Sequence, residues 1–387
     1  MTKNTGSPVY HGFEQGPIRP PSEAYSLLIR VTRNCPWNRC TFCPVYKDAK
    51  FSLRPVDHVK KDIDAVHKYV TLLRDSGGNA KYFSQAGIPG MDREVQPGEM
   101  MAFQAAANWV YGGMRSIFLQ DANSLVAKPG DVVEILRHLK TCFPWVERIT
   151  SYARSHTIAR IRVADLKAIA DAGLNRIHIG LESGSDEVLK RVNKGVSKEL
   201  HIQAGLKVKA AGMELSEYVM PGLGGKALRE SHALETADAL NKINPDFIRL
   251  RTLAIPNRPE LYREYCSGEF ERLTDVQVVN EILLFIENLD GITSVLKSDH
   301  ILNLLQELEG TFPGDKERMI GLLRSFLDME PERQCVFQVG RRLGILTRLS
   351  DLEDSRKYAA AESVCRQYGV TPDNVDKLIE EATKRFI

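Results

Sequence analysis

The sequence predicts an α/β fold, a full or partial (β/α) barrel of parallel strands followed by an α-helical C-terminal region. Short, mostly apolar segments alternate with amphipathic helical segments up to about residue 300, where the strand pattern stops. The chain has 387 residues, of which 43% are hydrophobic, so it can bury a large core. An open doubly wound sheet is the alternative, because periodicity along a chain does not show whether its sheet closes.

The first half of the chain supplies the first strands and helices of this alternation. Residues 1–24 are rich in Pro, Gly and polar groups and predict an extended N-terminal arm. The apolar run 25–31 predicts the first buried strand, and the helical spacing of apolar residues in 56–76 predicts a helix. Further strands are expected at 116–121, 148–153 and 176–181, followed by helices at 129–141, 163–173 and 185–193 respectively.

The alternation continues to residue 297. The expected helices are 197–212, 226–243 and 274–289, and the expected strands are 214–220, 247–254 and 291–297. Six or seven β-α units in a row favour parallel strands with right-handed crossovers. After residue 300 only helices are expected, at 301–309, 315–328, 331–348, 356–368 and 373–385. We therefore predict three parts: the arm over 1–24, the barrel over 25–300 and a helical cap over 301–387.

The charge balance argues against several kinds of partner. The chain has 52 basic and 50 acidic residues and a net charge of +2, which gives no general attraction to nucleic acid or to an anionic membrane. No run approaches the roughly 20 apolar residues of a membrane helix, and the N-terminus lacks the apolar core of a signal peptide. We expect a cytoplasmic protein, with no membrane partner and no nucleic-acid partner.

Three of the seven cysteines, Cys35, Cys40 and Cys43, lie within nine residues in a C-x4-C-x2-C loop. An odd number of cysteines, four of them scattered, argues against a disulfide framework. Three thiolates in one tight loop suit a soft metal centre. A four-iron cluster normally takes four protein thiolates, so three would leave one iron open to another ligand. Zinc is the competing metal, although a structural zinc site takes four protein ligands.

This cysteine loop, directly after the first strand of an α/β barrel, resembles that of the radical S-adenosylmethionine (SAM) superfamily. The family's commonest spacing is C-x3-C-x2-C, and this chain has one residue more between Cys35 and Cys40. The segment IGLESGSDEVLKRVNKG at 179–195 resembles the branch that contains oxygen-independent coproporphyrinogen oxidase, the methylthiotransferases and the Elp3-like proteins. The resemblance covers roughly residues 25–300.

The resemblance implies an enzyme that cleaves SAM reductively at a 4Fe–4S cluster held by the three cysteines. The 5′-deoxyadenosyl radical so formed would abstract hydrogen from a substrate. An external reductant such as a ferredoxin or a flavodoxin is implied as a partner. Whether the net reaction is that of an oxidoreductase or a transferase stays open.

The resemblance also implies residues that bind the amino and carboxylate groups of SAM. Phe42 matches the aromatic residue that the family usually places before the third cysteine. Asp121 stands where the family usually has a Gly-Gly-Glu-Pro motif, and it is the best candidate to accept hydrogen bonds from the ammonium group. The end of the next strand offers Ser151 and Arg154, and Arg154 could pair with the carboxylate. A turn role for Asp121 and a surface ion pair for Arg154 are the structural alternatives.

In that branch the Glu of GLESG and a basic residue one helix later lie near the cofactor. By position this implies Glu182, Ser183 and Arg191, with Lys194 as a second basic candidate. A glutamate at the end of a strand can accept hydrogen bonds from ribose hydroxyls, and Arg191 can meet a carboxylate. The alternative is a helix N-terminus whose acidic residues favour the helix dipole.

A Gly-rich turn at 218–225, which includes Gly222, resembles the family's turn whose backbone approaches the adenine. The segment TLAIP that follows the next strand includes Leu253, which would supply an apolar edge for the base.

Residues at later strand ends are candidates for the substrate side. Arg249 and Arg251 alternate on one expected strand, so both should point the same way and suit a small anionic substrate or paired carboxylates. Asp299 and His300 follow the last strand and could carry a substrate proton, although a helix cap is the alternative for Asp299. Cys266 is the scattered cysteine that we select for a catalytic role.

Two other classes of protein would share the cysteine loop. An iron–sulfur electron-transfer or scaffold protein would hold a cluster without cleaving SAM. A zinc-binding α/β protein would hold zinc at the same thiolates.

Overall fold

The fold is described from a computed structural model, which covers residues 9–75 and 95–383. The chain forms two compact units. The first comprises Met1–Pro36, Asp48–His178 and Lys207–Glu214, and the second Trp37–Lys47, Ile179–Leu206 and Leu215–Ile387.

Eight strands form one sheet in the order β1-β4-β5-β6-β7-β8-β9-β10. Its strands are β1 (Leu27–Arg30), β4 (Ser116–Gln120), β5 (Arg148–Ala153), β6 (Arg176–Glu182), β7 (Glu214–Val219), β8 (Phe247–Leu250), β9 (Val295–Lys297) and β10 (Gly310–Thr311). β1 pairs in parallel with β4, β4 with β5, β7 with β8 and β8 with β9, whereas β10 runs antiparallel to β9. β1 and β10 stand at the two ends of this order, which in the described part of the chain corresponds to a partial barrel.

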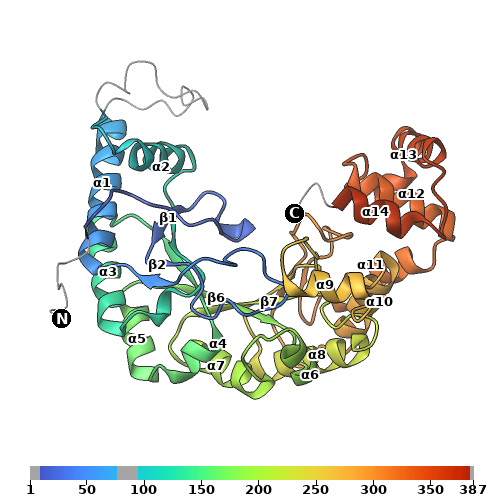
Figure 1. Ribbon diagram of the computed structural model, residues 1–387, viewed down its shortest axis with the longest axis horizontal. Coiled ribbons are helices and arrows are strands. Elements are labelled where there is room, and N and C mark those ends of the chain that lie inside the picture. The colour runs from blue at the N-terminus through green and yellow to red at the C-terminus, as the bar shows by residue number, and fades with distance from the viewer. Residues whose placement is uncertain (1–8, 76–94, 384–387) are drawn as a thin grey trace. The chain divides into compact units, whose positions relative to one another are not determined.

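In the first unit, helices flank the strands of the sheet, and one strand is buried along its whole length. All five residues of β4 are buried, as expected for a parallel strand covered on both faces. α1 packs beside α2 and α3 (Figure 1). The helical elements are η1 (Pro21–Glu23), α1 (Val56–Asp75), α2 (Met100–Tyr111), η4 (Ser124–Val126), α3 (Pro129–Cys142), α4 (Ser155–Arg160) and α5 (Val163–Asp171), and a two-stranded antiparallel ribbon joins β2 (Thr32–Arg33) to β3 (Ser52–Leu53).

In the second unit, helices follow the later strands and then continue alone to the end of the described chain. α10 begins with a capping box in which Thr274 and Gln277 exchange hydrogen bonds. α12 packs against α13 and α14 (Figure 1). The remaining helical elements are α6 (Asp186–Arg191), α7 (Lys198–Ala210), α8 (Arg229–Ile243), α9 (Glu260–Ser267), α10 (Asp275–Glu287), α11 (Lys316–Leu327), α12 (Pro331–Arg342), η5 (Leu349–Glu353), α13 (Ser355–Gln367) and α14 (Val375–Thr383).

The structure confirms the predicted fold class, a mainly parallel sheet with helices, and differs in several elements. α2 and α9 were not expected from the sequence. The helix expected at 301–309 is wrong: this segment has turns and bends, and β10 follows it. The Asn303 side chain there accepts a hydrogen bond from the Thr252 backbone and donates one to the Leu250 carbonyl. These long-range hydrogen bonds outweigh the local helical pattern. Among the described residues, no helix has the length and apolar character to cross a bilayer.

Candidate cofactor site

In the second unit, two of the three loop cysteines lie in or against an apolar cluster. Cys40 and Phe42 are buried in it, and Cys43 packs against it. Backbone hydrogen bonds hold this part of the loop: Thr41 donates to the Val192 carbonyl and accepts from the Leu261 amide. Cys35, which belongs to the first unit and follows β2, is half-buried. The remaining members of the buried cluster are Val188, Val192, Met220, Leu223, Leu253, Leu261 and Phe270.

Next to Phe42 lies a buried ion pair. Lys194 is 8% exposed, its Nζ lies 3.0 Å from Glu182 Oε1, and it stands 5.8 Å from the centre of the Phe42 ring. Glu182 ends β6 with φ of 63°, a left-handed conformation that turns the chain out of the strand. A Cβ at position 180 would lie 2.2 Å from Glu182 Oε1, so only glycine leaves room for this carboxylate.

A second carboxylate, Glu217 on β7, completes a charged group that the sequence analysis missed. Its side chain is fully buried, and neither carboxylate oxygen has a hydrogen-bond partner in the described part of the chain. Desolvation, with a further contribution from Glu182, raises the pKa of Glu217 well above its ordinary value, against the opposing effect of Lys194. The second glutamate of the mostly apolar strand ELSEYVM was the available signal. We call Glu182, Lys194 and Glu217 the inner charged cluster.

Gly222 and Leu253, both predicted to lie near the adenine, are adjacent. The Leu253 amide donates to the Pro221 carbonyl at 2.9 Å, and a Cβ at position 222 would lie 3.6 Å from Leu253 Cβ. Gly222 has φ of 86°, which strains any residue except glycine. The tight turn therefore depends on this glycine.

A buried network supports this turn and Ser183. The Gly222 amide donates to Glu281 Oε1 at 2.7 Å, and His232 Nδ1 lies 2.8 Å from Ser183 Oγ. His232 Nε2 lies 3.1 Å from the Met220 carbonyl, so a neutral imidazole donates there and accepts from the serine hydroxyl. Desolvation lowers the pKa of His232 to about 4 and raises the pKa of Glu281 to about 8. Both groups are therefore neutral near pH 7, although they lie 3.7 Å apart.

Arg191, predicted from the resemblance as the basic partner of the cofactor, contacts a different set of residues. Its guanidinium lies 5.2 Å from the centre of the Phe270 ring and 3.8 Å from Glu264, and it donates to the Glu269 carbonyl. Lys194, the second basic candidate, is the residue that pairs with Glu182.

In the first unit, Asp121 is buried and already paired. Arg30 donates two hydrogen bonds to Asp121 Oδ2, at 2.7 and 3.0 Å, and the Asn34 amide lies 3.4 Å from the same oxygen. A Cβ at position 16 would lie 2.6 Å from Asp121 Oδ1, so the N-terminal arm passes directly over the carboxylate. The charge of Asp121 is therefore balanced by Arg30.

Ser151 and Arg154, the other candidates in this unit, are near the next strand end. Ser151 is fully buried, and its hydroxyl, which has one proton to donate, lies 3.3 Å from the Leu119 carbonyl oxygen and 3.1 Å from the Tyr152 carbonyl oxygen. The Arg154 amide donates to Asn123 Oδ1 at 3.2 Å, which places Arg154 at the start of α4.

The candidate residues for the substrate side differ in how far they are exposed to solvent. Arg249 is 5% exposed, and its guanidinium lies 2.7 Å from Asp299. The strand expected at 247–254 ends at Leu250, so Arg251 leaves the strand pattern and is exposed. Burial, followed by Arg251, lowers the pKa of His300 to about 4, against the opposing effect of Asp299. Cys266 is exposed on α9.

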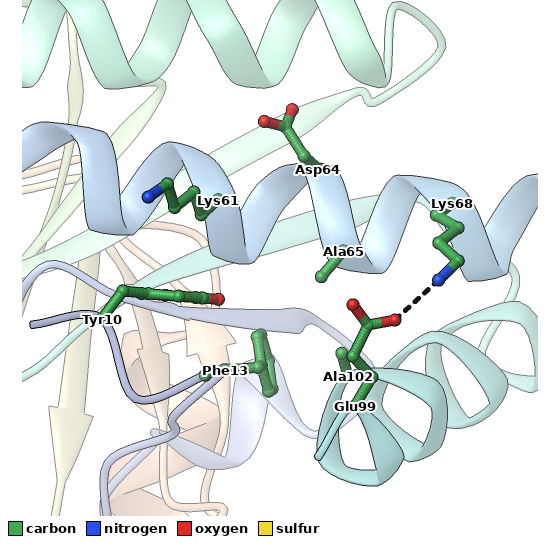
Figure 2. Close-up of a pocket in the computed structure, with 9 residues that line it drawn as sticks. Tyr10, Phe13, Lys61, Asp64, Ala65, Lys68, Glu99 and Ala102 are labelled. Atoms are coloured by element: carbon green, nitrogen blue, oxygen red, sulfur yellow. Dashed lines mark hydrogen bonds and ion pairs between the residues drawn. The ribbon is translucent and has the colours of Figure 1, made fainter. Parts of the chain in front are cut away.

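A separate cavity of about 310 Å³ lies in the first unit, between the arm, α1 and α2. Figure 2 shows Lys68 directed toward Glu99 on one side of it and Tyr10 on another. The Lys68–Glu99 pair is 2.7 Å long, and Lys61 stands 5.4 Å from the centre of the Tyr10 ring. No predicted site residue lines this cavity.

A parallel α/β fold with a cysteine loop near its first strand and a buried charged cluster defines a candidate cofactor-binding enzyme. The profile of the radical SAM superfamily matches residues 29–237, a stretch that includes all three loop cysteines. The chain belongs to the radical SAM superfamily of enzymes, which confirms the predicted family. Membership implies SAM and an iron–sulfur cluster.

Individual relatives share only parts of their length with this chain. The 4′-phospho-dehydrooxetanocin synthase of Priestia megaterium is 29% identical over 228 residues, which cover 56% of this chain and 27% of that protein. The tRNA-2-methylthio-N(6)-dimethylallyladenosine synthase of Desulfosudis oleivorans is 25% identical over 193 residues, 48% of this chain and 40% of that protein. Coproporphyrinogen III oxidase from Escherichia coli aligns in structure over 68% of this chain and 52% of its own, with a TM-score of 0.44 and 14% identity.

Proposed function

We propose that this protein cleaves SAM reductively at a 4Fe–4S cluster held by Cys35, Cys40 and Cys43, and that the 5′-deoxyadenosyl radical so formed abstracts hydrogen from a substrate. The observation that carries this proposal is the superfamily match over 29–237, which includes the whole cysteine loop. The burial of Cys40 and the packing of Cys43 against an apolar cluster are consistent with a cluster shielded from water.

The inner charged cluster fits a ligand that brings hydroxyl groups. Buried carboxylates nearly always have hydrogen-bond partners, and both oxygens of Glu217 lack one among the described residues. We propose that both side chains form hydrogen bonds with the ribose of SAM: Glu182 as an acceptor whose charge Lys194 balances, and Glu217 as a neutral carboxyl group. Gly222 and Leu253 would bind the adenine.

The residues that would hold the amino acid part of SAM remain Asp121, Ser151 and Arg154. Because Arg30 already neutralises Asp121, its carboxylate would be shared between the guanidinium and the ammonium group of SAM. Arg191 would act from a more peripheral position, beside Phe270.

On the substrate side we propose Arg249 and Arg251 as the groups that meet a small anionic substrate, with Asp299, His300 and Cys266 as catalytic candidates. Arg249 would orient Asp299 through their 2.7 Å ion pair. We further propose a cytoplasmic location, a ferredoxin or flavodoxin as reductant, and the division into arm, barrel and helical cap given above.

The test is anaerobic reconstitution of the full chain with iron and sulfide, reduction with dithionite and incubation with SAM. We expect 5′-deoxyadenosine and methionine to form, and Cys40→Ala to lose most of its cluster iron, whereas the matched Cys365→Ala variant keeps it. An intact cluster that yields no 5′-deoxyadenosine would instead indicate an electron-transfer or scaffold protein. Zinc in place of iron at the loop would indicate the zinc-binding alternative.

A further inference from the structure

Three potential metal ligands converge on the side of α1 that faces α3, within the first unit. His138 Nε2 lies 2.7 Å from Asp64 Oδ1. Cys142 Sγ lies 3.8 Å from His138 Nε2 and 3.9 Å from Asp64 Oδ1. Figure 2 shows the Asp64 carboxylate pointing away from Tyr10 and Phe13, to the opposite side of α1 from these residues.

The convergence has a simple origin in the helices. His138 and Cys142 are four residues apart on α3, so their side chains lie on one face of that helix. α3 packs against α1, which brings Asp64 opposite this face. Val132, Ile135, Leu136 and Leu139 of α3 are buried, so the helix that carries two of the three ligands is held by its apolar side.

We propose that Asp64, His138 and Cys142 bind a zinc-type divalent metal ion with three protein ligands and a fourth position open to water. A thiolate, an imidazole and a carboxylate are the ligand types that zinc takes in proteins. No residue of this site belongs to the cysteine loop or to the inner charged cluster.

The distances are close to those that zinc requires. Zinc bonds of about 2.0 Å to nitrogen and oxygen and about 2.3 Å to sulfur place tetrahedral ligand atoms about 3.3 Å apart for N and O, and about 3.6 Å apart for S and N. The His138–Asp64 contact of 2.7 Å would have to open by about half an ångström on metal binding, and the two sulfur contacts would shorten slightly. Asp64 is exposed and His138 only partly buried, so side-chain rotation can supply these shifts.

The test uses the full chain with its iron–sulfur cluster reconstituted, so that the loop thiolates are occupied. After exposure to Zn²⁺ and removal of loose metal by gel filtration, we expect one bound zinc per chain by elemental analysis. Zinc-edge X-ray absorption should show one sulfur ligand and the rest nitrogen or oxygen. Zinc at the cysteine loop would show three sulfur ligands, and that outcome would overturn the proposal.

Variants test whether these three residues bind the zinc. Cys142→Ser and His138→Gln should each weaken zinc binding at least about tenfold, whereas Glu134→Gln, an exposed acid on the same helix, should bind zinc as the original chain does. Circular dichroism checks that each variant is folded. Unchanged zinc binding in Cys142→Ser, or equal loss in the Glu134→Gln control, would contradict the assignment. The readout is independent of SAM cleavage, so failure here leaves the proposed function standing.

Discussion

At the scale of single residues, Glu217 is fully buried and both of its carboxylate oxygens lack a hydrogen-bond partner among the described residues. A carboxyl group buried without partners costs free energy, because the hydrogen bonds it makes with water in the unfolded chain are not replaced. Burial beside Glu182 keeps this group protonated to a pH well above its ordinary range. Such a cost is expected where a ligand later supplies the missing partners.

We therefore predict opposite effects of Glu217→Leu on stability and on binding. The free energy of unfolding of the protein without SAM should rise by about 1–3 kcal/mol, because an unpartnered polar group is removed. The affinity of the reconstituted protein for SAM should fall at least about tenfold, because the hydrogen bonds between the Glu217 carboxyl group and the ribose are lost. Urea unfolding and equilibrium dialysis measure the two effects. Glu187→Gln, an exposed acid on α6, is the control that should change neither, and a destabilised Glu217→Leu protein would contradict the argument.

The two basic candidates near Glu182 can be separated by experiment. Lys194 is buried and pairs with Glu182, whereas Arg191 contacts Glu264 and Phe270. We expect Lys194→Met to weaken SAM binding about tenfold or more, since it leaves Glu182 without its partner, and Arg191→Met to have a much smaller effect. If Arg191→Met is the more damaging change in the same dialysis experiment, the inner charged cluster does not serve the cofactor in the way proposed.

At the scale of elements, two helices hold the turn at the end of β7. α10 contributes Glu281, which accepts the Gly222 amide, and α8 contributes His232, which joins Ser183 to the Met220 carbonyl. Both side chains are buried and neutral near pH 7, so the turn is positioned by uncharged hydrogen bonds. A change of protonation in Glu281 or His232 would disturb this turn and, with it, the predicted cofactor residues Gly222 and Ser183.

This arrangement predicts a pH dependence of stability. Burial raises the pKa of Glu281 to about 8 in the folded state. The contribution of Glu281 to the free energy of unfolding is therefore full below about pH 4.5 and is lost as the pH rises toward about 8. Glu281→Gln should remove the fall in stability between about pH 4.5 and about pH 8, measured by urea unfolding between about pH 4 and about pH 9. Glu287→Gln, at the exposed end of α10, should leave the curve unchanged. A fall in stability over this pH range that survives in Glu281→Gln would belong to another group.

His232 has the opposite effect on stability over an overlapping pH range. Its folded pKa is lowered to about 4, so its contribution is full above about pH 6.5 and is lost as the pH falls toward about 4. His232→Gln should therefore remove the rise in stability between about pH 4 and about pH 6.5 and leave the fall caused by Glu281 in place. Loss of that fall in His232→Gln would mean that the two groups titrate as one unit.

At the scale of the whole molecule, the proposed reaction has a cofactor side and a substrate side. The cofactor side rests on Cys40, Phe42 and the inner charged cluster, which are buried except for the partly buried Glu182. The substrate side rests on Arg251, which is exposed, and on Arg249, which is buried and paired with Asp299. The chain spans 27% and 40% of the two relatives described, so their substrates do not identify the substrate here.

The variant Arg251→Ala should separate cleavage of the cofactor from turnover of the substrate. We expect slow, substrate-independent formation of 5′-deoxyadenosine to stay within about twofold of the original protein, because an exposed guanidinium contributes little to folding. Turnover of an anionic substrate, once one is found, should fall. Loss of the uncoupled reaction would show that Arg251 serves the cofactor or the fold instead.

The sequence by itself determined the family, the strand–helix alternation and the position of the three-cysteine loop. These features are local: apolar periodicity and the spacing of Cys35, Cys40 and Cys43 are complete within short segments. The predicted strand at 247–254 and helix at 301–309 failed where long-range hydrogen bonds, such as those of Asn303, outweigh local preference.

Only the tertiary structure decided which charged groups are buried, which are exposed and which form ion pairs. The burial of Glu217, the pairing of Lys194 with Glu182 and of Arg30 with Asp121, and the exposure of Arg251 each depend on residues far apart in the chain. The sequence alone does not show whether a carboxylate is surrounded by water or by a guanidinium. The free energy of burying the carboxylate depends on the solvent and the charges around the folded side chain. The cysteine loop was therefore predictable from the sequence alone, whereas the inner charged cluster was not.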